Sequence, residues 1–168
     1  MELRQTIWNL MGEERRLAAA KSFWESSERK GAQRQVEQML AQRLHARPVF
    51  LKKLSPEKKA SYLARDMATM PYLWDAVMIS YHFAAHRQML IDFLDALGIP
   101  NDKGHYESGE TVQPPATETV ESAVKTLQEK YDRTDVLVYL GAAVTQDPVF
   151  WANLKPIVER MAAESVAV

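Results

Sequence analysis

Apolar residues recur every three or four positions along most of this chain, which is the spacing of one face of an α-helix. No stretch alternates apolar and polar residues for long enough to predict a β-strand. We therefore expect an all-α protein, a single-domain bundle of about seven to eight helices over residues 1–168. The pattern predicts a short amphipathic turn or helix at 2–11 and helices at 13–27, 32–46, 49–54, 56–70, 71–97, 117 or 119 to 131, 134 or 135 to 145, and from 148 to the frayed tail at 164–168.

The segment 71–97 is the expected centre of the bundle. Pro71 suits the first position of a helix, where a missing N–H group leaves no hydrogen bond unmade, and Gly98 suits the position after the end. Apolar residues cover most of the circumference of this 27-residue segment, so we expect one long and largely buried helix. Ionisable residues interrupt the apolar run too early for a membrane span; they are Asp75, His82, His86, Arg87 and Asp92.

Residues 62–77 and 139–154 match each other at an offset of 77, and residues 39–54 share the pattern more weakly. In each pair of helices, a proline opens the second helix, and its aromatic residues are expected to pack back on the first. The pattern predicts repeated proline-started helical hairpins; the alternative is that any two amphipathic helices joined at a proline look partly alike. The identical positions are Tyr62, Leu63, Pro71 and Trp74 against Tyr139, Leu140, Pro148 and Trp151.

Residues 98–116 break the helical pattern and hold three of the six glycines and three of the eight prolines. We expect one long irregular loop that is largely exposed over residues 100–113, with a short hairpin around 105–111 as an open alternative. Such a long loop inside a compact domain is usually functional or disordered. After it, Pro148 is expected to start the last helix, and Pro156 is expected to kink or divide that helix.

The net charge of −1 conceals an asymmetry between the two parts of the chain. Residues 1–60 hold 13 basic and 7 acidic residues, whereas residues 61–168 hold 8 basic and 15 acidic residues. Such a split is one sign of nucleic-acid binding, but Arg34 and Arg43 lie about 180° apart on one helix, which argues against a basic face. The chain has no cysteine and no apolar signal sequence near residue 1, so we expect a cytoplasmic protein without a membrane partner.

One constellation of side chains has the spacing of a ligand site. His82 and His86 lie four residues apart on one helical face, where two imidazoles can share a metal ion. Asp75 falls on the same side but lies roughly 10 Å along the axis from His82, too far to complete the same site. His105 in the long loop, or Asp66, is a conceivable third ligand. The opposite side of the helix is polar, so we expect both imidazoles to point inward and to need a partner. That partner is a metal or, more commonly, a carbonyl or carboxylate of a neighbouring helix, so we assign no metal ion.

No motif of a known reaction class is present: the chain lacks a glycine-rich phosphate loop, a nucleophile elbow and an HExxH sequence. We assign no catalytic residue and expect no cofactor. The sequence favours a non-enzymatic helical protein–protein interaction or scaffold module, with Trp74 and Trp151 in its core. The alternative is a metal- or small-ligand-binding helical protein, enzymes included, that uses His82, His86 and the 98–116 loop. An exposed apolar patch favours the first function, and a cavity that touches the histidines favours the second.

Overall fold

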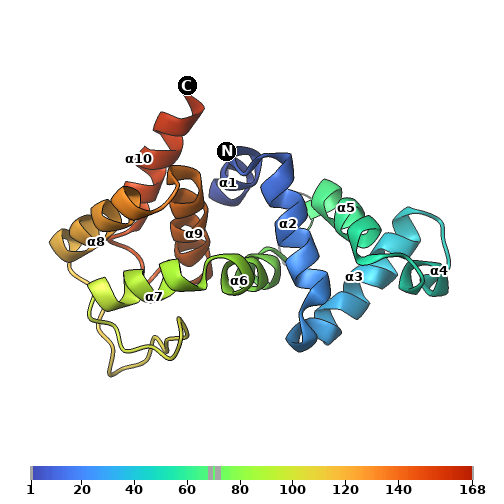
Figure 1. The fold of residues 1–168 in the computed structure, drawn as a ribbon, viewed down its shortest axis with the longest axis horizontal. Coiled ribbons are helices and arrows are strands. Elements are labelled where there is room, and N and C mark those ends of the chain that lie inside the picture. Colours follow the sequence, from blue (N-terminus) through green and yellow to red (C-terminus); the bar gives the residue numbers. More distant parts are fainter. Residues whose placement is uncertain (1, 68–69, 71–72, 168) are drawn as a thin grey trace. The chain divides into compact units, whose positions relative to one another are not determined.

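The computed structural model describes residues 2–67, 70 and 73–167 (Figure 1). Within these residues the regular structure is helical, and the only β-type pairing is an isolated bridge between Asp102 and His105. The all-α prediction is therefore confirmed. The helices are α1 (Leu3–Leu10), α2 (Gly12–Glu25), the short 3-10 helix η1 (Ser27–Arg29), α3 (Lys30–Arg43), α4 (Pro48–Lys52), α5 (Pro56–Asp66), α6 (Trp74–Ala85), α7 (Arg87–Ala96), α8 (Thr117–Lys130), α9 (Arg133–Gln146) and α10 (Lys155–Val166). Over the described part of the chain, no helix is both long and apolar enough to cross a membrane.

The chain divides into two compact units. Unit 1 consists of Met1–Met11 and His82–Val168, and unit 2 consists of Gly12–Tyr81. Helix α6 passes from unit 2 into unit 1 between Tyr81 and His82. The organisation of residues 1–168 as a single domain stays a prediction.

Unit 2 is built around the packing of α2 against α5, and α3 packs against both α4 and α5. Helix α5 begins as the sequence predicts: the Ser55 Oγ atom accepts a hydrogen bond from the backbone N–H of Lys58 at 3.3 Å, and Pro56 lies in the first turn. The side chains in the core of this unit are apolar and almost completely buried; they include Phe23, Val36, Leu40, Leu51 and Leu63.

The segment 71–97 does not form one unbroken helix. Helix α6 ends at Ala85 and α7 begins at Arg87, because His86 adopts φ −132° and ψ 27°, outside the helical region. The backbone N–H of His86 still donates to the His82 carbonyl at 2.8 Å, and that of Leu90 donates to the His86 carbonyl at 3.2 Å. The prediction of one unbroken helix is therefore wrong. The apolar pattern gives no sign of the break because the helical register continues across it. Pro71, its expected first residue, lies outside the described residues.

The last helix also differs from the prediction. Residues 148–154 form a series of turns, and α10 begins only at Lys155 with Pro156 in its first turn. Pro156 therefore starts a helix instead of kinking one, since its missing N–H group would have had no partner there. Pro148 lies in a turn, so the prediction that a helix starts at this residue is wrong. The repeat of proline-started hairpins stays a prediction.

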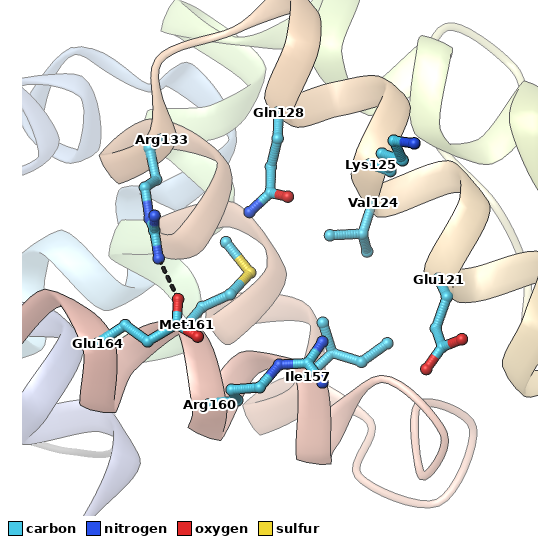
Figure 2. A pocket seen from close by; sticks show the side chains of 9 residues that line it. All are labelled: Glu121, Val124, Lys125, Gln128, Arg133, Ile157, Arg160, Met161 and Glu164. Carbon is cyan, nitrogen blue, oxygen red and sulfur yellow. Dashed lines mark hydrogen bonds and ion pairs between the residues drawn. The ribbon is translucent and has the colours of Figure 1, made fainter.

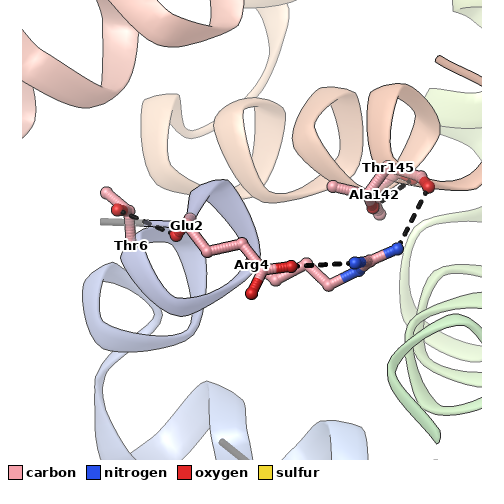
Figure 3. Close-up of polar contacts among 5 residues, drawn as sticks. All are labelled: Glu2, Arg4, Thr6, Ala142 and Thr145. Carbon is pink, nitrogen blue, oxygen red and sulfur yellow. Dashed lines mark hydrogen bonds and ion pairs between the residues drawn. The ribbon is translucent and has the colours of Figure 1, made fainter. Parts of the chain in front are cut away.

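Helix α9 is the centre of unit 1, with α1, α8 and α10 packed against it (Figure 1). Its residues from Val136 to Val144 are all buried. A Cβ atom at Gly141 would lie only 1.9 Å from the Cδ1 atom of Ile7 on α1, so the absence of a side chain at residue 141 lets the two helices approach closely. At the end of α9, the Arg4 Nη2 atom donates to the Thr145 carbonyl at 3.4 Å, and Glu2 accepts from Arg4 at 2.9 Å (Figure 3). A cation at this position complements the partial negative charge of a helix C-terminus.

The loop at 98–116 is exposed at most of its positions, as predicted, but hydrogen bonds hold it against the rest of unit 1. The Nε1–H group of buried Trp151 donates to the Tyr106 hydroxyl at 2.8 Å. Farther along the loop, the Ser108 hydroxyl donates to the Asp147 carboxylate at 2.9 Å. The bridge between Asp102 and His105 precedes the stretch 105–111, where a short hairpin was the alternative, and residues 105–111 themselves form no hairpin.

We predict that Gly141→Ala lowers the free energy of unfolding by about 1–2 kcal/mol. The added methyl group must displace buried Ile7, an overpacking cost of about 1–3 kcal/mol, while alanine regains ~0.5–1 kcal/mol of helix propensity. Chemical denaturation of the variant and of the parent protein measures this difference in the free energy of unfolding. Gly31→Ala is the matched control, because a Cβ atom at this helical position meets nothing within 4 Å, so the variant is expected to be slightly stabilised. The Ile7→Val/Gly141→Ala double variant should recover part of the loss, and strict additivity would contradict this explanation.

We predict that Tyr106→Phe destabilises the protein by ~1–3 kcal/mol, because it leaves the N–H group of buried Trp151 without its acceptor. The same variant should increase amide hydrogen exchange over residues 106–112, which measures the loosening of the loop. Ser108→Ala serves as the control, since its hydrogen bond is exposed. Unchanged exchange in Tyr106→Phe would show that other contacts hold the loop.

Candidate functional site

His82 is buried in unit 1, with 3% of its surface exposed. Its ring lies 5.6 Å from the ring of His86, measured between centroids, and 5.4 Å from the ring of Tyr139 on α9 in an edge-to-face arrangement. The inward orientation of His82 agrees with the helical pattern. The pair of histidines predicted from their four-residue spacing is thus brought together beside α9.

Burial and, to a smaller extent, the neighbouring His86 together lower the pKa of His82 from 6.5 to about 3, while a backbone hydrogen bond with Val138 of α9 acts in the opposite direction. Desolvation also raises the pKa of the Tyr139 hydroxyl above its usual value. Both groups are therefore neutral near pH 7. The interior at this point resists charge, which suits packing between helices better than acid–base chemistry.

His86 is half-buried at the junction of α6 and α7. Its Nε2 atom lies 3.7 Å from the Oδ2 atom of Asp135 in the first turn of α9. A carboxylate from a neighbouring helix therefore stands beside this imidazole, and the two form an ion pair when His86 is protonated. The contact joins the helix break to the start of α9.

The other two predicted site residues lie elsewhere. The ring of His105 is exposed and stacks on Phe83 at 4.0 Å between centroids, with 14° between the ring planes. Asp75 lies in the first turn of α6, in unit 2. Across the described ranges, no three histidine, aspartate or glutamate side chains are arranged to hold a metal ion. A ligand-binding role for His82, His86, Asp75 and His105 stays a prediction.

A groove in unit 1, which the sequence did not indicate, encloses about 530 Å³ between α8, the first turn of α9 and α10 (Figure 2). Three buried apolar side chains, Val124, Ile157 and Met161, contribute to its surface. The remaining lining residues are polar or charged: Glu121, Lys125, Gln128, Arg133, Arg160 and Glu164. The positions on α8 follow helical spacing, which identifies one face of that helix but not the helix opposite.

Unit 2 has an exposed apolar corner where α3 meets α4. Leu44, Val49 and Phe50 are 40%, 59% and 54% exposed. We call these three residues, with the exposed Arg47, Lys52 and Lys53 that lie near them in the sequence, the α3–α4 corner. The other large apolar side chains that are exposed in the described chain stand singly in the sequence, whereas three fall within residues 44–50 here.

We predict that the free energy of unfolding falls as the pH is lowered below 6.5, by at most about 1.4 kcal/mol per pH unit for His82. The reason is that the unfolded chain binds a proton at residue 82, whereas the folded protein does not until the pH approaches about 3. His82→Gln should make this pH dependence shallower, as denaturation at several pH values would measure. His105→Gln, at an exposed histidine, is the control substitution. Equal slopes in His82→Gln and the parent protein would contradict a buried neutral imidazole.

Comparison with family models, with curated proteins and with solved structures finds no match for this chain. Its function must therefore be inferred from its own surfaces. Three features are available: the histidine pair beside α9, the groove between α8 and α10, and the α3–α4 corner. Of these, the α3–α4 corner is the one whose large apolar side chains are exposed, since Leu44, Val49 and Phe50 are 40% or more exposed.

Proposed function

We propose that this protein is a non-enzymatic helical protein–protein interaction module that binds its partner through the α3–α4 corner. The observation that carries the proposal is the exposure of Leu44, Val49 and Phe50 at one corner of unit 2. The partner is a protein segment that presents an apolar anchor flanked by acidic side chains.

The local structure explains why these side chains face outward. Helix α4 is a single short helix that begins with Pro48, and Leu51, which is 1% exposed, fixes it to the core. The preceding residues Val49 and Phe50 therefore lie outside the core although both are strongly apolar. Covering such side chains contributes about 25 cal/mol per Å² of buried apolar surface, and an aromatic ring at the centre of an interface is a frequent source of binding energy.

Charge around the corner favours an acidic partner. Arg47, Lys52 and Lys53 are exposed and make no ion pair within the described residues. They lie in the part of the chain, residues 1–60, that has six more basic than acidic residues. Complementary charge raises the rate of encounter and excludes basic partners, while the apolar contact supplies affinity.

A ligand-binding role for the histidine pair remains the alternative prediction. The groove of Figure 2 is lined by neither His82 nor His86, so it lends this alternative no support. A short helix such as α4 also offers little surface for lying on a lipid bilayer, which a long amphipathic helix uses. The corner therefore fits a protein segment better than a lipid bilayer, and it is a better-supported site than the histidine pair.

We predict that Val49→Glu weakens binding of an acidic amphipathic peptide by about tenfold or more, because it buries a like charge and removes an apolar contact. The probe is a short labelled helical peptide with leucine on one face and glutamate on the other, measured by fluorescence anisotropy. A peptide with lysine in place of glutamate should bind far more weakly. Val149→Glu is the matched control, since Val149 is 81% exposed and lies outside the corner.

Three results would contradict the proposal. The first is an equal effect of Val49→Glu and Val149→Glu on the affinity for the peptide. The second is binding to anionic lipid vesicles that depends on the corner, with no binding to the peptide. The third is self-association of the parent chain that Val49→Glu abolishes, because the occupant of the corner would then be a second copy.

A further inference from the structure

We propose that the groove between α8 and α10 is a second binding site, which takes a small organic anion with one carboxylate on an apolar body. This site is in unit 1 and is independent of the α3–α4 corner, which is in unit 2. The proposal rests on the volume of the groove, on the apolar side chains in its lining, and on which of its charged side chains form ion pairs.

The groove has the dimensions of a small-ligand site. Its volume of about 530 Å³ falls within the range of roughly 300–1,000 Å³ that is typical of such sites. Figure 2 shows the side chains of α8 and α10 on opposite sides of the space, with Arg133 from the start of α9 at one end. Val124, Ile157 and Met161 provide the apolar part of the lining, but they are only 3%, 6% and 3% exposed, so they offer a ligand a small apolar contact in a mostly polar groove.

The cations of the groove differ in whether they are already neutralised. Arg133 is paired with Glu164, an interaction that joins α9 to α10 at the edge of the groove (Figure 2). In contrast, Lys125 and Arg160 make no ion pair or hydrogen bond with any described residue, and the amide of Gln128 is likewise uncommitted. Two positive charges and an amide donor therefore line the groove without a partner in the described part of the chain, although the carboxylates of Glu121 and Glu164 line it as well.

This concentration of cations opposes the net charge of the surrounding unit. Residues 82–168 hold seven basic and thirteen acidic residues, yet three of the seven basic residues line this one groove. An anion in the groove would be attracted by Lys125 and Arg160, and a guanidinium group matches a carboxylate with two parallel hydrogen bonds. The groove is open to solvent, so this attraction should weaken as salt is added.

Glu121 limits the charge of the ligand. It lines the groove on the same helix face as Lys125 and makes no ion pair among the described residues. A second negative charge on the ligand would meet repulsion from this carboxylate, so a monoanion fits better than a dianion. The combination of an apolar surface, two uncommitted cations and one opposing acid points to an amphipathic monocarboxylate.

Octanoate is a suitable probe, and octylamine and octanol serve as matched ligands with opposite charge or none. Titration into the full chain, followed by methyl NMR, should give saturable shifts at Ile157 and Met161 with octanoate, and much weaker ones with the other two. Arg160→Gln should weaken octanoate binding by about tenfold, and Lys125→Gln by roughly threefold. Glu121→Gln should strengthen it, because it removes the opposing charge.

Lys155→Gln is the control variant, because Lys155 is an exposed cation of α10 that does not line the groove. It should leave the affinity for octanoate unchanged. Equal binding of octanoate and octylamine would overturn the proposal, since the groove would then recognise only the alkyl chain. Equal weakening by Lys155→Gln and Arg160→Gln, or the absence of saturable shifts at Ile157 and Met161, would also overturn it.

Discussion

The burial of α9 is the constraint on which the structure of unit 1 depends. Every residue from Val136 to Val144 is buried, so this helix has no polar face and other elements must surround it. Gly141 permits the close approach of α1, and the ring of Tyr139 contacts both His82 and Phe93. The helices that cover α9 therefore owe their positions to this apolar surface.

The same burial determines what the histidines can do. Because desolvation keeps His82 and Tyr139 neutral, they contribute ring packing and no charge to the centre of the unit. His86 lies at the edge of this region, where Asp135 stands beside it. Charged groups available to a partner or ligand are found instead on the surface, in the groove and in the α3–α4 corner.

Polar contacts at the surface join elements that are distant in sequence. Asp92 of α7 accepts hydrogen bonds from Lys130 and Tyr131 at the end of α8, and these bonds lower its pKa to about 2 although partial burial acts in the opposite direction. The hydrogen bond between Tyr106 and Trp151 also joins distant elements, because it holds a long exposed loop against the turns before α10.

The sequence by itself determined the helical class and several helix ends, because caps and turns act over a few residues. Ser55 and Pro56 start α5, and Gly98, with φ +67°, stands in the left-handed conformation predicted for the position after the segment 71–97. The inward position of the His82 ring also followed from helical spacing. These features depend on neighbours within one turn of the same helix.

Only the tertiary structure decided the features that require distant residues to meet. The break at His86 keeps the backbone hydrogen bonds on both sides, so no periodic pattern reveals it. The contact of His86 with Asp135 joins residues far apart in the chain, and so does the groove formed by α8 and α10. A sequence records which face of a helix is polar, but which other face it meets depends on the packing of all the helices around α9.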